Sequence, residues 1–274
     1  MPHRGSTIPS SVTGIHTIIC EAPFVVTPED PTGAATAQTI TALGDLLSEG
    51  DLVVDGGNSK FTDDIVHAEE LRGKGIAFVD CGVSGGIWGQ QNGYGLMCGG
   101  EAEHVAMVMP IFDALRPEGP RDEGFVHAGE VGSGHYVKMV HNGIEYGLMQ
   151  AYAEGFELLL AKDTVKDVPG SFKAWTRGTV VRSWLLDLMV AALAEDHDLA
   201  EIRGYVNDSG EGRWTVEEGI AHAVPMPAIT AALFARFSSR QDDSPQMKAV
   251  AALRNQFGGH AVTKAGESGV LTDH

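Results

Sequence analysis

The pattern of short apolar runs in the first 130 residues constrains the fold most strongly. These runs alternate with segments of helical periodicity, as expected when each strand is followed by a helix that covers the sheet. The predicted strands span residues 15–26 (weakly), 52–55, 76–80, 94–98 and 125–127, and the predicted helices between them span 36–47, 63–74 and 104–115. This order predicts a parallel α/β sheet of the Rossmann type.

The strand signals end near residue 130, where Gly129, Gly132 and Gly134 cluster. Beyond this point the apolar periodicity is helical throughout. The predicted helices span residues 133–162, 171–195, 197–207, 214–222, 227–240 and 244–256. We therefore predict an incomplete Rossmann-like parallel sheet domain in residues 1–130 and a helical domain in residues 131–274, which the length of the chain allows.

The first helix of the second domain carries a polar stripe on an otherwise apolar surface. Lys138, His141, Asn142 and Glu145 recur at i, i+3, i+4 and i+7, which places them on one face, and Tyr146 is the next residue round. Burying lysine and glutamate is costly unless they are paired or liganded. The stripe therefore indicates a site in which Lys138 and Glu145 act as acid and base on one substrate; solvated surface charges at the same spacing are the alternative.

Charge and cysteine content exclude several classes of function. A formal net charge of −18 argues against binding to nucleic acid or to an anionic membrane through overall electrostatics. The three cysteines, Cys20, Cys81 and Cys98, form no CxxC motif, so we expect reduced thiols, a cytoplasmic protein and no metal site. No apolar run is long enough for a membrane span, and the first residues lack the apolar core of a secretory signal.

Several motifs resemble those of the 6-phosphogluconate dehydrogenase family. The segment KMVHNGIEYG (138–147) is similar to its catalytic helix, DGGNS (55–59) to a motif at the end of a strand in its nucleotide-binding domain, and GVSGG (82–86) to its substrate-binding turn. Residues 254–260 resemble its C-terminal substrate clamp. The resemblance covers about residues 25–265, and DSGEGRW (208–214) is similar to the short bacterial form of the enzyme.

This resemblance implies a reaction and its catalytic residues. The reaction is the oxidative decarboxylation of 6-phosphogluconate to ribulose 5-phosphate and carbon dioxide, in the pentose phosphate pathway and gluconate utilisation, with NAD or NADP as hydride acceptor. Lys138 would take the proton of the C3 hydroxyl and later assist decarboxylation as an acid, and Glu145 would deliver a proton to C1. Because a lysine base must lose its proton well below its reference pKa of about 10.4, we expect burial and neighbouring cationic groups to lower the pKa of Lys138.

The resemblance also implies how the sugar acid is bound. Ser84, Gly85 and Gly86 would bring backbone N–H groups close to the substrate carboxylate, which only small residues permit. His141 and Asn142 would hydrogen-bond substrate hydroxyl and carboxylate groups. No metal is required for this chemistry.

Phosphate binding is expected from a further set of residues. Tyr146 and Arg236 would bind the phosphate, joined by Arg254 and His260 of the partner subunit in a homodimer or homotetramer with a shared active site. The sequence departs from the pattern of the family's long form at Ser209 and Glu211, where lysine and threonine are usual. A phosphate-binding role for these two residues is therefore left open.

The glycine fingerprint of a dinucleotide-binding domain does not precede residue 55. Such a domain opens with a strand, G-x-G-x-x-G and a helix; the nearest similar segment, residues 132–134, opens the catalytic helix and lacks the third glycine. We therefore expect a truncated start of the reading frame or, alternatively, a natural cofactor-poor paralogue. Asn58 is then the remaining residue expected to bind the cofactor, and we expect the chain as given to bind nicotinamide dinucleotide weakly. The similarity to the short form favours NAD over NADP.

Two other functions stay open. One is another β-hydroxyacid dehydrogenase of the 3-hydroxyisobutyrate type, which shares the Ser-Gly-Gly turn and a helix lysine. The other is a catalytically impaired substrate-binding or dimerising remnant, which the absent fingerprint favours. The HNGIEYG segment and the 254–260 tail favour 6-phosphogluconate dehydrogenase over both.

Overall fold

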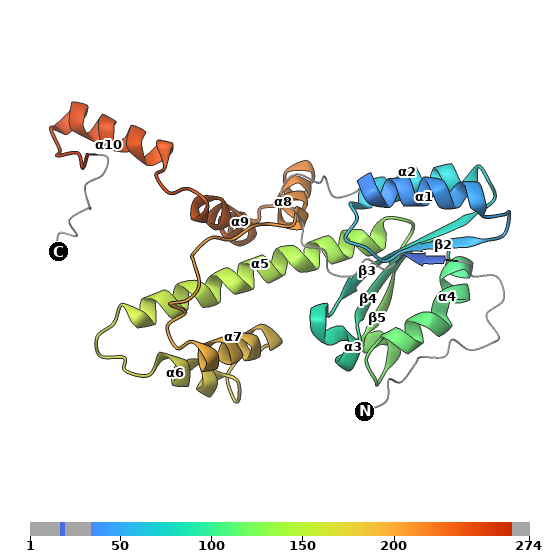
Figure 1. Cartoon of the computed structure of the whole chain (residues 1–274), viewed down its shortest axis with the longest axis horizontal. Coiled ribbons are helices and arrows are strands. Elements are labelled where there is room, and N and C mark those ends of the chain that lie inside the picture. The colour runs from blue at the N-terminus through green and yellow to red at the C-terminus, as the bar shows by residue number, and fades with distance from the viewer. Residues whose placement is uncertain (1–16, 20–33, 265–274) are drawn as a thin grey trace. The chain divides into compact units, whose positions relative to one another are not determined.

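A computed structural model describes residues 17–19 and 34–264 (Figure 1). The chain divides into two compact units, one formed by Met1–Lys166 with Asp208–Ala231 and the other by Asp167–Asn207 with Ala232–His274. The first unit contains the sheet, and the described part of the second is helical. These two units are discontinuous in the sequence, and the domain boundary predicted near residue 130 remains a prediction.

Five strands form one sheet in the first unit, in the order β1-β2-β3-β4-β5. They are β1 (Thr17–Ile19), β2 (Leu52–Asp55), β3 (Ala77–Ser84), β4 (Gly95–Gly99) and β5 (Phe125–Gly129). The pairs β1/β2, β2/β3 and β4/β5 are parallel, which confirms the predicted α/β fold. Most of the weak strand predicted over residues 15–26 lies outside the described residues.

The pair β3/β4 is antiparallel, contrary to the prediction of a wholly parallel sheet. The connection between these strands holds only a 3₁₀ turn, Gly86–Trp88, and the one-turn helix α3, Gly89–Asn92. A parallel connection needs a crossover of about a dozen residues or more, usually with a full helix, so this short segment returns the chain antiparallel.

Helices cover both faces of the sheet. Helices α1 (Ala34–Leu46) and α2 (Phe61–Arg72) lie on one face and α4 (Ala102–Leu115) on the other (Figure 1). Successive side chains of β2 point to opposite faces, so Val53 packs with the α1/α2 side while Leu52 and Val54 pack with the α4 side. The free cysteines Cys81 and Cys98 are cross-strand partners in the α4-side core, and Cys20 lies outside the described residues.

Helix α5 (Ser133–Leu160) is the long helix predicted for this region, and it spans 28 residues. Its buried residues all lie between Gly134 and Tyr146. The prediction of a largely buried helix is therefore wrong for the second half, where Leu158 is 73% exposed. At 1.5 Å per residue the helix is about 42 Å long, much longer than strands of five to eight residues, so the sheet covers only its beginning.

The remaining helices confirm some predictions and correct others. Helix α8 (Glu211–Ala221) belongs to the first unit, α9 (Pro227–Ser239) crosses from one unit to the other, and α6 (Val168–Trp175), α7 (Trp184–Glu195) and α10 (Pro245–Gly258) belong to the second. Within the described residues no strand follows Gly129, as predicted.

Two helix predictions in the second unit are wrong. The helix predicted over residues 171–195 is broken by Gly178, whose φ of +73° is left-handed, and α7 restarts at the Ser183 N-cap, whose hydroxyl accepts from the Leu186 N–H. Residues 197–207 form turns instead of a helix, with Leu199 at a φ of +55°. None of the helices in the described part of the chain is long and apolar enough to cross a membrane.

Candidate active site

Asp80 of β3 fixes the beginning of helix α5. Its carboxylate is fully buried and accepts the backbone N–H groups of Gly132 at 2.7 Å and His135 at 2.9 Å. Glycine is required beside it, because a Cβ on Gly99 would lie 2.4 Å from one carboxylate oxygen and a Cβ on Gly134 would lie 2.7 Å from the other. A carboxylate at a helix N-terminus is stabilised by the unpaired N–H groups and the helix dipole.

Lys138 lies one turn into α5 and is pressed against β3. Its side chain is buried, and a Cβ added to Gly82 would lie 2.3 Å from the Lys138 Cβ, so glycine at position 82 is what allows the helix to approach. Burial lowers the pKa of Lys138 below its ordinary value, although the charges of Glu211 and Glu145 act to raise it. The predicted direction of the shift is confirmed, but the neighbouring charges are anionic and not the cationic groups that we expected.

The predicted polar stripe forms on α5. The Lys138 ammonium donates to the Asn142 side-chain oxygen at 2.9 Å, and Nδ1 of His141 lies 2.9 Å from the same oxygen. Because α5 is an unbroken α-helix, Glu145 seven residues after Lys138 lies on the same face, half-buried. This face therefore presents an amine of lowered pKa, an amide, an imidazole and a carboxylate together.

Helix α8 packs on this part of α5 through two close contacts at glycines. A Cβ on Gly143 would lie 2.6 Å from the Thr215 side chain, and one on Gly212 would lie 2.5 Å from the Tyr146 ring. The Thr215 hydroxyl donates to the Met139 carbonyl at 2.9 Å. This packing holds Tyr146, a predicted phosphate ligand, in the same unit as Lys138.

A buried carboxylate on α8 was not anticipated from the sequence. Glu211 is 3% exposed, its Oε2 accepts the Ser209 hydroxyl at 2.7 Å, and the Ser209 N–H donates to the Tyr146 hydroxyl at 3.3 Å. Among the described residues, Oε1 of Glu211 has no hydrogen-bond partner. The sequence marked Ser209 and Glu211 only as departures from a pattern, and nothing in their spacing indicates that a carboxylate faces the lysine.

The predicted substrate turn begins at the end of β3, two residues after Gly82. Ser84 closes the strand, and Gly85 and Gly86 follow with φ values of +146° and +52°, conformations that side chains disfavour. Gly85 is also crowded, since a Cβ there would lie 3.0 Å from the Tyr94 ring. The turn thus exposes backbone at the same end of β3 that contacts Lys138.

Asn58, the predicted cofactor and substrate contact, is exposed just past the carboxyl end of β2. This edge of a parallel sheet is where ligands bind in open α/β folds. The next residues are tied down on both sides, because the Ser59 hydroxyl donates to Asp55 at 2.6 Å and the Lys60 ammonium lies 3.6 Å from Glu217 of α8.

The other predicted phosphate ligands lie in the second unit. Arg236 is in α9 and donates to the Asn207 carbonyl at 3.1 Å. Arg254 and His260, in and just after α10, are exposed, and the His260 carbonyl accepts from the Asn255 side chain at 2.9 Å. Their predicted role in one site with Lys138 stays a prediction.

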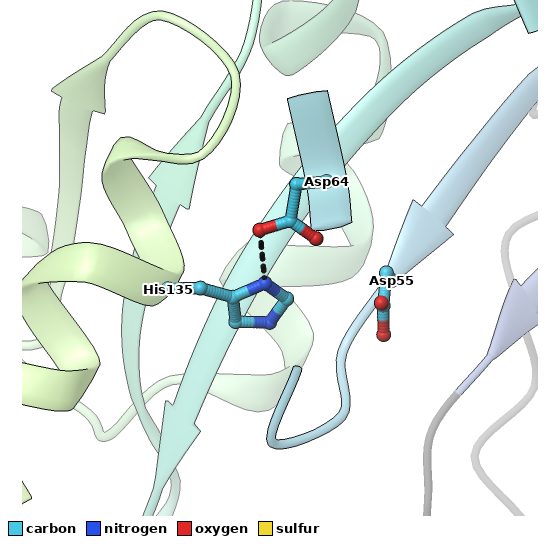
Figure 2. A group of neighbouring side chains, drawn as sticks. All are labelled: Asp55, Asp64 and His135. Atoms are coloured by element: carbon cyan, nitrogen blue, oxygen red, sulfur yellow. Dashed lines mark hydrogen bonds and ion pairs between the residues drawn. The ribbon is translucent and has the colours of Figure 1, made fainter. Parts of the chain in front are cut away.

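His135 lies among three fully buried carboxylates, those of Asp55, Asp64 and Asp80. Its Nδ1 lies 2.7 Å from Asp64 Oδ2, and Figure 2 shows the imidazole directed at Asp64, with Asp55 nearby at the end of its strand. Burial raises the pKa of Asp64 to about 7, although the hydrogen bond and charge of His135 act to lower it. Burial alone lowers the pKa of His135, but the hydrogen bond to Asp64 and the three carboxylate charges outweigh it and raise the value to about 9.

Comparison with known proteins assigns both parts of the chain. The NAD binding domain of 6-phosphogluconate dehydrogenase matches residues 18–117, and the C-terminal domain of 6-phosphogluconate dehydrogenase matches residues 134–268. A putative 6-phosphogluconate dehydrogenase of Bacillus subtilis is 42% identical over 219 residues, which are 80% of this chain and 72% of that protein. The NAD(+)-dependent, decarboxylating 6-phosphogluconate dehydrogenase of Haloferax volcanii is 43% identical over 235 residues, 85% of this chain and 77% of that one.

A solved structure agrees with these sequence relatives. The 6-phosphogluconate dehydrogenase of Plasmodium falciparum superimposes with a TM-score of 0.69 at 27% identity, covering 86% of this chain and 51% of that structure, so this chain spans about half of its length. The buried lysine and amide of α5 and the glycine turn of β3 therefore lie in a chain that belongs to the 6-phosphogluconate dehydrogenase family.

Proposed function

We propose that the protein catalyses the oxidative decarboxylation of 6-phosphogluconate to ribulose 5-phosphate and carbon dioxide, with a nicotinamide dinucleotide as hydride acceptor. The observation that carries the proposal is the face of α5, on which a buried Lys138 of lowered pKa is hydrogen-bonded to Asn142 and shares its face with Glu145. The names of the relatives at 42% and 43% identity support the same reaction.

Lys138 serves as the base in this proposal. Because its pKa is lowered, a larger fraction of Lys138 is neutral at a given pH than of an exposed lysine. The neutral amine takes the C3 hydroxyl proton while the nicotinamide, when bound, accepts the hydride. The resulting ammonium then lies beside the new carbonyl and assists loss of carbon dioxide. Glu145 supplies the proton that C1 needs afterwards.

The surrounding residues bind and orient the sugar acid. The backbone of Ser84, Gly85 and Gly86 is proposed to bind the carboxylate, and His141 and Asn142 the carboxylate and hydroxyl groups. Their support is the exposed turn at the Gly82 end of β3 and the hydrogen bonds that already join His141, Asn142 and Lys138.

Phosphate binding is proposed for Tyr146 and Arg236, with Arg254 and His260 of the partner subunit completing the site in a homodimer or homotetramer. An arginine fork suits a phosphate because it donates two parallel hydrogen bonds. In this arrangement residues 131–274 form the helical substrate and dimerisation domain.

The cofactor is a nicotinamide dinucleotide, and we favour NAD over NADP. The support is the similarity to the short form and the 43% identity to a relative named as NAD(+)-dependent. Asn58, exposed at the carboxyl end of β2, is placed to contact a dinucleotide at that edge of the sheet. We further propose a cytoplasmic location.

The test is an absorbance assay for reduced cofactor with 6-phosphogluconate and millimolar NAD or NADP. Carbon dioxide release is measured in parallel, and 3-hydroxyisobutyrate is the competing substrate. The proposal expects 6-phosphogluconate-dependent reduction with equal release of carbon dioxide, faster with NAD. Reduction with 3-hydroxyisobutyrate alone, or with neither substrate, contradicts it.

A further inference from the structure

We propose that Asp64 and His135 form a buried ion pair that positions the catalytic base Lys138 by fixing the first turn of α5 to the sheet domain. This inference rests on the proposed function, because Lys138 is the base of that reaction. Neither residue belongs to a motif that the sequence singled out, and they are 71 positions apart in the chain.

The pair joins three elements at one point. Asp64 comes from α2 and His135 from the first turn of α5, and their side chains are 0% and 1% exposed with 2.7 Å between Oδ2 and Nδ1. The backbone N–H of the same histidine donates to Asp80 of β3 at 2.9 Å. His135 therefore ties the beginning of α5 to α2 through its side chain and to β3 through its backbone.

The charges around the pair explain why a histidine suits this position. The groups that face His135 are the carboxylates of Asp55, Asp64 and Asp80, from β2, α2 and β3. Buried charges are costly unless they are paired, and a protonated imidazole is the cation that offsets part of this negative charge. With a pKa of about 9, His135 carries its proton in the neutral range, and Asp64, with a pKa of about 7, is mostly ionised above pH 7, so the ion pair is most populated between about pH 7 and 9.

Lys138 follows His135 by three residues, so the two side chains lie on neighbouring parts of one helix surface. The Lys138 Cβ and the Gly134 carbonyl both pack against Gly82 of β3, so the position of Lys138 depends on where the first turn of α5 is held. The groups that face Lys138 are Glu211 and Glu145, together with the Asn142 amide. A shift of the first turn would therefore move the Lys138 amine relative to the substrate without removing any group that binds the substrate.

A cation bound by Asp55, Asp64 and His135 is the competing interpretation. One ligand atom from each lies within 4.8 Å of the others, and among the described residues His135 Nε2 and Asp64 Oδ1 have no hydrogen-bond partner. Two facts favour the ion pair. The oxygens of Asp55 already accept the Gly57 N–H at 2.9 Å and the Ser59 hydroxyl at 2.6 Å, and 2.7 Å between nitrogen and oxygen is the length of a charge-assisted hydrogen bond.

The kinetic experiment compares Asp64→Asn and His135→Gln with Asp63→Asn, a neighbouring carboxylate on α2 that lies outside the cluster. We expect kcat to fall about 10–100-fold in the first two variants with KM changed far less, since small misplacement of a catalytic group costs rate more than binding. We expect Asp63→Asn to match the wild type. If all three variants turn over like an active wild type, the positioning role is overturned, whereas an inactive wild type contradicts the proposed function instead.

A second measurement needs neither turnover nor a stable variant. NMR titration of the His135 imidazole in the wild-type chain is expected to give a pKa raised toward about 9. A pKa at the ordinary value of 6.5 would show that the pair does not form. The same sample is titrated with Zn²⁺ and Mn²⁺: stoichiometric binding that shifts the His135 signals would establish a metal site and overturn the ion pair.

Discussion

The two halves of helix α5 depart from the usual distribution of side chains in opposite ways. In the first half, charged or polar groups such as Lys138 and His135 are buried, and in the second half large apolar groups such as Leu158 and Leu160 are exposed, at 73% and 47%. Buried charges indicate a site with specific partners, whereas exposed apolar groups indicate an uncovered surface. One continuous helix thus carries the proposed reaction centre at one end and, under the proposed dimer, a contact surface at the other.

The largest effect is expected from removing the base. Lys138→Ala should lower kcat by roughly 10²–10⁴-fold, because no other group on this face combines burial with a lowered amine pKa. Substrate binding should largely persist, since His141 and Asn142 remain. Steady-state kinetics with 6-phosphogluconate measures both quantities, and a rate near that of the wild type would remove Lys138 from the mechanism.

Replacing the acid should have a somewhat smaller effect. Glu145→Gln keeps the shape of a half-buried side chain but cannot deliver a proton to C1, so kcat should fall about 10²-fold with the fold intact. Isotope incorporation at C1 of the product in heavy water should slow together with turnover. Unchanged incorporation would assign the proton to another group.

The close contact between α5 and β3 can be tested at Gly82. A Cβ there would lie 2.3 Å from the Lys138 Cβ, so Gly82→Ala should lower the free energy of unfolding by about 1–3 kcal/mol and reduce kcat as well. Gly95→Ala is the matched control on β4, where the nearest atom to an added Cβ is 3.9 Å away. Equal unfolding midpoints for the two variants in denaturant would show that the helix does not press on Gly82.

The ion pair at the beginning of α5 predicts a pH dependence of stability. The pKa of His135 is about 9 in the folded protein and about 6.5 when unfolded, so the folded state binds the proton more tightly. The contribution of the His135 proton is fully present below pH 6.5 and is lost as pH rises through about 9, a change of roughly 1–3 kcal/mol in the free energy of unfolding. Asp64, whose pKa is raised to about 7, adds a fall in stability as pH rises from about 4 to 7. Denaturant titrations from pH 6 to 10 should show this fall in the wild type and a weaker one in His135→Gln; parallel curves would contradict the pair.

A substitution in the exposed second half of α5 should have the smallest effect on the stability of the chain. Leu158→Ser should change the free energy of unfolding by no more than about 0.5 kcal/mol, because the side chain loses little burial within one chain. Under the proposed dimer it should instead weaken self-association, which sedimentation at several concentrations measures. Unchanged association would place the subunit contact elsewhere.

Local patterns were sufficient for β2 to β5, for α5 and for its stripe, because short apolar runs and i, i+4, i+7 spacing depend only on neighbours in the sequence. They failed where tertiary contacts or unusual backbone decide. The Asp64–His135 contact joins residues 71 positions apart, and the burial of Glu211 depends on the packing of α8 against α5. The helix predicted over residues 197–207 does not form, and Leu199 within it has a left-handed backbone that its neighbours in the sequence do not indicate.

The most direct test of the account is the titration of the Lys138 amine itself. Nitrogen NMR of protein labelled at lysine, with the Lys138→Ala spectrum to identify the signal, follows this one group without substrate or cofactor. The account predicts a pKa below the ordinary 10.5, because burial outweighs the attraction of Glu211 and Glu145. A pKa at or above 10.5 would mean that the carboxylates keep Lys138 charged, and it would contradict its assignment as the base.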